Sequence, residues 1–157
     1  MKKYLKMERL LKKTQKLEQD YKFSAQRYSR YSNYITFPAV IITSVASIFS
    51  FLSTSEFVPR ETKDYSIVTV AIFSTVASTL QTIGASCEFN VKSLKFREAS
   101  HELNKISDKI FFEIENPNEE NFIDKIEKQI ETAKTACKFL PLEAPLENNA
   151  HEGYHSI

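Results

Sequence analysis

The sequence predicts an all-α membrane protein, in which two transmembrane helices form a hairpin and long helices extend from it into a cytosolic three-helix bundle. Two long segments, residues 31–55 and residues 65–87, contain no Asp, Glu, Lys, Arg or His, although the chain has 21 Lys and Arg and 20 Asp and Glu. A helix rises about 1.5 Å per residue, so the first segment exceeds the roughly 30 Å hydrocarbon core of a bilayer. The short segment 56–64 between them predicts an external loop.

Basic residues predict the orientation of this hairpin. Lys and Arg residues are frequent just before the first segment and just after the second, whereas the loop carries two basic and three acidic residues. Cytoplasmic flanks are enriched in Lys and Arg. We therefore expect a multi-pass integral membrane protein with both termini in the cytosol.

Residues 1–30 predict a cytosolic amphipathic helix. Apolar and small residues recur there at steps of three and four, from Tyr4 and Met7 to Tyr28. This helix could lie on anionic lipid, but the stripe has few Leu and no Trp, which favours packing against other cytosolic helices. Tyr28, Tyr31 and Tyr34 then predict an aromatic belt at the inner interface.

The two spans carry ordered hydroxyl residues as well as apolar ones. Pro38 predicts a kink in the first span, and an ordinary kink is favoured over a gating hinge. Small and hydroxyl side chains let membrane helices approach closely and hydrogen-bond. Gln81 is the most polar side chain in either span and should face protein or water. The candidate pore-lining or helix–helix interface residues are Thr43, Ser47, Ser50, Ser74, Ser78, Gln81, Thr82 and Ser86.

Beyond the second span, residues 88–115 predict a helix that continues it without a break, because the segment has no Pro or Gly. Its apolar residues follow coiled-coil spacing: Phe96, Ala99, Leu103, Ile106 and Ile110. Asn116, Pro117 and Glu119 predict the capped start of a last helix, 116–140. The apolar face of that helix is predicted to consist of Phe122, Ile126, Ile130, Ala133 and Cys137. Residues 141–157 contain two prolines and few apolar residues, which predicts a disordered tail.

No arrangement of residues indicates catalysis, and we expect neither an enzyme nor a cofactor. Two glycines cannot build a Gly-rich phosphate loop. His151 and His155 are four residues apart but fall in the predicted tail, so no metal site is expected. Cys87 and Cys137 have no CxxC spacing, and we expect free thiols.

Two segments carry a resemblance to a known family. They are RYSRYSNYITFPAVIITSVASIFSFLST, and ASCEFNVKSLKFREASHELNKISDKI after the second span. With them the chain resembles the SLATT superfamily of two-span membrane proteins, over about residues 21–140, and more closely its relatives in large DNA viruses. The resemblance implies an oligomeric pore-forming effector of the kind found beside nucleotide second-messenger systems.

Two functions therefore stay open. One is an oligomeric pore or channel-like effector, lined by the hydroxyl residues. The alternative is a non-conducting, membrane-anchored scaffold whose cytosolic helices bind a partner. The expected partners are the lipid bilayer and further copies of the chain, with a cytosolic protein as an additional candidate and no nucleic acid.

Overall fold

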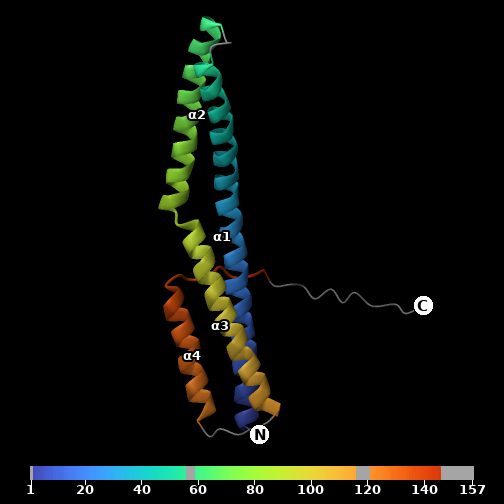
Figure 1. Ribbon diagram of the computed structural model, residues 1–157. Helices are drawn as coiled ribbons and strands as arrows, with labels where there is room; N and C mark the ends of the chain where they lie inside the picture. The colour runs from blue at the N-terminus through green and yellow to red at the C-terminus, as the bar shows by residue number, and fades with distance from the viewer. Residues whose placement is uncertain (1, 56–58, 116–120, 146–157) are drawn as a thin grey trace, which may run out of the picture.

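The computed structural model describes residues 2–55, 59–115 and 121–145, and all regular structure within them is α-helical. The helices are α1 (Lys2–Thr54), α2 (Arg60–Ser86), α3 (Phe89–Glu115) and α4 (Phe122–Cys137). α1 runs the length of the molecule, with α2 beside its C-terminal half, α3 beside its N-terminal half and α4 against α3 (Figure 1). The predicted all-α fold is confirmed. We call α2 and residues 31–54 of α1 the hairpin, and α3, α4 and residues 2–30 of α1 the stem.

Two stretches of helix are long and apolar enough to cross a membrane, Lys3–Thr54 and Thr62–Glu115. Only 11% and 6% of their most apolar windows is buried. The core helix of a water-soluble protein would be mostly buried, so these exposed apolar surfaces need another environment. α1 is one helix of 53 residues, or about 80 Å at 1.5 Å per residue.

Buried residues on α1 follow a seven-residue repeat with one change of phase. Met7, Thr14 and Tyr21 form one series, and Ser32, Ala39 and Ala46 form the next. The step from Tyr21 to Ser32 is eleven residues, which inserts four residues into the repeat and locally changes the phase of the buried stripe. α1 exchanges α3 for α2 as its neighbour just beyond this point (Figure 1).

The stem is held by one apolar cluster with contributions from α1, α3 and α4. Leu103 and Ile110 of α3 are fully buried, and Tyr21 of α1 packs against Phe96 with ring centroids 5.8 Å apart. The residues that helical spacing predicted for the inner faces of the last two helices are all buried: Phe96, Ala99, Leu103, Ile106, Ile110, Phe122, Ile126, Ile130, Ala133 and Cys137.

The chain breaks between α2 and α3, so the prediction of an unbroken helix through residue 88 is wrong. Glu88 has φ 51°, and its N–H donates to the Ala85 carbonyl at 3.2 Å. A left-handed residue other than glycine costs roughly 1–2 kcal/mol. Beyond the turn, the Ser32 hydroxyl donates to Oδ1 of Asn90 at 2.6 Å, and this bond fastens the start of α3 to α1.

The segment predicted as loop 56–64 is shorter than expected. α2 begins at Arg60, and the Lys63 N–H donates to the carbonyl of Pro59 at 3.2 Å. A proline is well tolerated where a helix starts, and charged residues end an apolar segment without ending a helix. The second helix therefore extends beyond the predicted 65–87 at its N-terminal end.

The last helix is also shorter than the predicted 116–140. α4 starts at Phe122 after Asn121 and ends at Cys137, where Lys138 takes a left-handed conformation with φ 61°. Asn116, Pro117 and Glu119, which were expected to cap it, lie outside the described residues.

Residues 138–145, which we call the strap, run from the end of α4 across to α1 (Figure 1). The Leu142 N–H donates to Oγ of Ser24 at 2.7 Å, and the Ala144 N–H donates to Oδ1 of Asp20 at 2.8 Å. Residues 141–145 are therefore ordered by side chains of α1, and the prediction of disorder from residue 141 is wrong for them. The rest of the predicted tail lies outside the described residues.

Candidate functional site

Small residues bring the two helices of the hairpin together. Ala39 and Ala46 of α1 and Ala77 of α2 are buried in a structure that leaves most hairpin side chains exposed. A Cβ atom on Gly84 would lie only 3.3 Å from Cγ2 of Ile35. Close backbone approach at small residues is how membrane helices associate.

One flank of this contact is hollowed and partly polar. The hollow lies where α2 meets α3, and its lining includes Thr36 and Val40 of α1 and Gln81 and Ala85 of α2. Glu88 and Asn90 line its end nearest the stem. Thr36 and Gln81 thus open on the same side of the hairpin.

Helical repetition extends this side along the hairpin, because residues seven apart lie on nearly the same face of a helix. On α1, Thr43 and Ser50 follow Thr36 in steps of seven, and Ser47 follows Val40. On α2, Ser74 precedes Gln81 by seven and Ser78 precedes Ala85 by seven. Of the eight predicted site residues, Gln81 lines the hollow itself. Helical repetition places five more on the same side of the hairpin. We call this side the polar face: Thr43, Ser47, Ser50, Ser74, Ser78 and Gln81.

The antiparallel register of the hairpin places hydroxyl residues of α1 and α2 at the same heights along the helix axes. Ile35 lies opposite Gly84, and the Phe49 and Phe73 rings meet edge to face with centroids 6.4 Å apart. The antiparallel register fixed by these contacts places Ser47 level with Ser74. The same register places Thr43 level with Ser78, so hydroxyls from both helices meet at two successive levels.

All six polar-face residues are exposed in the single chain. The Thr43 hydroxyl donates to the Ala39 carbonyl at 2.8 Å, and the Ser47 hydroxyl donates to the Thr43 carbonyl at 2.9 Å. Each of these hydroxyls donates its hydrogen to a carbonyl of its own helix, so its lone pairs remain to accept from an outside partner. The polar face can accept hydrogen bonds or coordinate a cation more readily than it can bind an anion.

The other two predicted site residues lie at or beyond the edge of this surface. Ser86 follows Ala85 of the hollow by one position, which turns it about 100° toward the back of α2. Thr82 lies one turn after Ser78, between the polar face and the back of α2. Both are exposed, and Thr82 donates to the Ser78 carbonyl at 2.8 Å. Whether any of the eight lines a pore stays a prediction.

Pro38, Tyr31 and Tyr34 lie in the part of the hairpin nearest the stem, and Tyr28 lies at the adjoining end of the stem. α1 continues through Pro38, which is exposed, and a kink there stays a prediction. Tyr28 is half-buried and stacks on Phe96 with centroids 5.4 Å apart, so it belongs to the packing of the stem. Tyr31 and Tyr34 are 38% and 75% exposed, as interfacial rings would be, and the belt stays a prediction.

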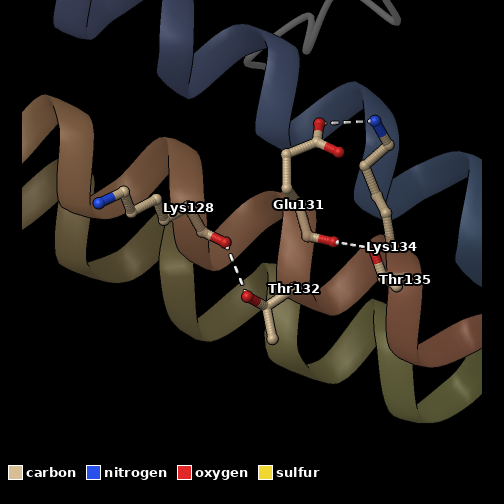
Figure 2. A network of polar contacts seen from close by, with 5 residues as sticks. All are labelled: Lys128, Glu131, Thr132, Lys134 and Thr135. Atoms are coloured by element: carbon tan, nitrogen blue, oxygen red, sulfur yellow. Dashed lines mark hydrogen bonds and ion pairs between the residues drawn. The ribbon is translucent and has the colours of Figure 1, made fainter.

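The ionisable groups of the stem fall into an inner and an outer set. Burial raises the pKa of the Tyr21 phenol and of the Cys137 thiol, and both cysteines are free. On the surface, the Lys134 ammonium donates to the Glu131 carboxylate at 2.8 Å and lowers its pKa (Figure 2). Lys105 lowers the pKa of Glu102 in the same way.

Sequence reasoning missed the anchor of the strap. Ser24 is fully buried and Asp20 is 9% exposed. The spacing of residues along this helix predicted a buried apolar stripe and did not predict these two buried polar residues. Their partners lie more than a hundred positions later, so no local signal could have identified them. Among the described residues, no group of three or more His, Cys, Asp or Glu could hold a metal ion, and His151 and His155 lie outside that part of the chain.

Comparison with known proteins gave no match to a family model, to a curated protein or to a solved structure. The resemblance to the SLATT superfamily is therefore carried by the two quoted segments alone and stays a prediction.

Proposed function

We propose that this chain is a non-enzymatic, two-span integral membrane protein whose hairpin lies in the bilayer and whose stem forms a cytosolic three-helix bundle. The exposed apolar surface of both long helices supports the hairpin assignment. The basic residues at the stem end support placement of both termini in the cytosol. This architecture accords with the SLATT resemblance.

We further propose that several copies assemble with their polar faces toward a common axis and form a pore. The single observation that carries this proposal is the convergence of hydroxyls from both helices and of Gln81 on one side of the hairpin. The outward side chains of the opposite flank include Ile41, Ile72 and Ile83, all about half exposed. In a ring of hairpins the polar face would meet water and the isoleucines would meet lipid.

The chemistry of the polar face favours weak selectivity for cations. Ser47 and Thr43 offer lone pairs, and Glu88 lies at the mouth of the hollow nearest the stem. Carboxylates at pore mouths favour cations. With Glu88 as the one ionisable side chain known to line the hollow, discrimination should be modest.

Leakage of ions from liposomes that contain the full chain tests the pore. Replacing Ser47 and Ser74 together by Leu should lower conductance strongly, because it places two branched side chains at one level of the polar face. Thr79 and Ser86, replaced together by Leu, provide the matched control, since they are exposed and lie toward the back of α2. A pore unaffected by S47L/S74L, or equally blocked by T79L/S86L, would contradict this lining.

The effect of the Glu88 charge on ion selectivity can be measured through the reversal potential. E88Q should move the reversal potential toward that of a non-selective pore, whereas E115Q, at the exposed far end of the stem, should not. Equal reversal potentials in wild type and E88Q would remove Glu88 from the conduction path.

A specific observation also favours the alternative of a non-conducting scaffold. Large apolar side chains are exposed near the start of α1 and the end of α3: Tyr4, Leu5, Phe111 and Phe112, at 50%, 51%, 55% and 65%. These two helix ends lie at the end of the stem farthest from the hairpin (Figure 1). Exposed apolar side chains there could bind a cytosolic protein. Discrete oligomers that never leak, together with a partner that is lost in F111S/F112S, would establish the scaffold in place of the pore.

A further inference from the structure

An unbroken group of aromatic rings lies where the stem meets the hairpin. The Tyr28 ring is 5.4 Å from Phe96 and 6.2 Å from Phe89, measured between centroids. Tyr31 is 5.9 Å from Phe89. Because Tyr31 is also the first residue of the charge-free segment 31–55, this cluster marks the depth at which α1 changes from polar to apolar surroundings.

Two cationic side chains, Arg27 and Lys92, lie over rings of this cluster. The guanidinium of Arg27 lies 5.9 Å from the centroid of Tyr31, and its Nε donates to the Tyr31 hydroxyl at 2.9 Å. Nζ of Lys92 lies 5.9 Å from Tyr28 and 5.7 Å from Phe139 of the strap. The rings therefore orient both cations without neutralising them.

Neither cation has an acidic partner in the described part of the chain. Elsewhere in the stem, lysines pair with glutamates three residues away, as Lys105 does with Glu102 at 2.8 Å and Lys134 with Glu131 at 2.8 Å. Glu88 is close in sequence but lines the hollow on the polar face. The positive charges of Arg27 and Lys92 are thus not compensated by any carboxylate of the described residues.

We propose that Arg27, Tyr31 and Lys92 bind the phosphate of an anionic phospholipid in the leaflet nearest the stem. Arg27 supplies a planar set of donors that suits phosphate. The Tyr31 hydroxyl accepts from Arg27, so its own hydrogen is free to donate to a phosphate oxygen. The ligand is a lipid, because Tyr34 and Ile41, 75% and 51% exposed, continue along α1 as an apolar strip for an acyl chain.

This inference rests on the proposed insertion of the hairpin into a bilayer. The test uses the full chain in neutral detergent, with thermal unfolding followed by circular dichroism while phosphatidylglycerol or phosphatidylcholine is added. A ligand that binds only the folded state raises the midpoint in proportion to its affinity. Phosphatidylglycerol should raise the midpoint more than phosphatidylcholine does.

R27Q/K92Q should lower the apparent affinity for phosphatidylglycerol roughly 30-fold, because each Lys or Arg near a membrane surface contributes roughly fivefold. K12Q/K109Q removes the same charge from exposed positions elsewhere in the stem and should behave as wild type. R27K keeps the charge but loses the planar donors, so its affinity should fall with the lipid-free midpoint unchanged. It also serves as the test if R27Q/K92Q does not fold.

Three results would overturn the lipid site. The first is that R27Q/K92Q, or R27K if the double variant does not fold, binds phosphatidylglycerol as the wild type does. The second is that K12Q/K109Q weakens binding equally, and the third is that inorganic phosphate alone produces the full shift of the midpoint. Flotation with phosphatidylcholine vesicles and resistance to alkaline extraction report insertion separately. A chain that inserts but does not distinguish the two lipids contradicts only the lipid site. A chain that does not insert contradicts the proposed function itself.

Discussion

The strap is the feature whose energetics can be worked out most directly, through Ser24→Ala. The Ser24 hydroxyl is fully buried, accepts from the Leu142 N–H at 2.7 Å and donates to the Asp20 carbonyl at 2.7 Å. The Leu142 N–H is partly buried, and leaving such a group without its acceptor costs about 1–3 kcal/mol. Alanine regains about 0.5 kcal/mol through its higher helix propensity. A net loss of about 0.5–2.5 kcal/mol is expected, mostly in the attachment of the strap.

Amide hydrogen exchange resolves this loss residue by residue. If the strap detaches as a unit, about 1.4 kcal/mol of lost protection makes the Leu142 and Ala144 amides exchange about ten times faster. Asp20→Asn keeps an oxygen acceptor for the Ala144 N–H and should retain most of the protection, whereas Asp20→Ala should not.

Thr135→Ala is the matched control. It removes a hydroxyl that is exposed and bonded only to the Glu131 carbonyl of its own helix at 2.8 Å (Figure 2). It should leave the strap amides unchanged. Unchanged exchange at Leu142 in Ser24→Ala, or equal acceleration in Thr135→Ala, would refute the view that this hydroxyl holds the strap.

Three further expectations concern the hairpin and the stem. Gly84→Leu forces a side chain against Ile35 and should destabilise the hairpin by about 1–3 kcal/mol in an unfolding titration in detergent, while Thr79→Leu on the back of α2 should have little effect. Leu103→Ala, at a fully buried site, should cost about 2–5 kcal/mol in free energy of unfolding, against under about 0.5 kcal/mol for Leu94→Ala, where the side chain is 55% exposed. Cys137 should react with a thiol reagent only after unfolding, whereas the half-buried Cys87 should react first. Since burial raises the pKa of Cys137, the unfolded chain ionises first, and stability should fall as pH rises through the ordinary thiol value of about 8.5. Faster labelling of Cys137, or a Leu94→Ala cost equal to that of Leu103→Ala, would contradict the assigned core.

The sequence predicted features that depend on periodicity and on long charge-free runs. The buried residues of α3 and α4 follow directly from apolar residues at steps of three and four. The hydroxyl residues could be sorted to one side of each helix in the same way. Whether the two sides coincide depends on the register of the antiparallel pair, which contacts such as that of Gly84 with Ile35 decide.

Features that depend on single backbone angles or on distant partners could not be predicted. Glu88 takes a left-handed conformation with no glycine or proline to signal it. Residues 141–145 of the strap look disordered by composition, and they are ordered because Ser24 and Asp20 supply acceptors for their backbone. The start of α2 was missed because a lipid boundary is marked by charge, whereas a helix boundary is marked by capping geometry.

The continuity of α1 has a mechanical consequence. α1 is uninterrupted from Lys2 to Thr54, whereas the opposite side of the molecule is divided into α2 and α3 by the turn at Glu88. A stiff rod about 80 Å long acts as a lever, so a tilt applied to its stem end displaces its far tip. The turn between α2 and α3 should bend more easily than a continuous helix. We therefore expect α1 to carry most of any motion that passes between the stem and the hairpin.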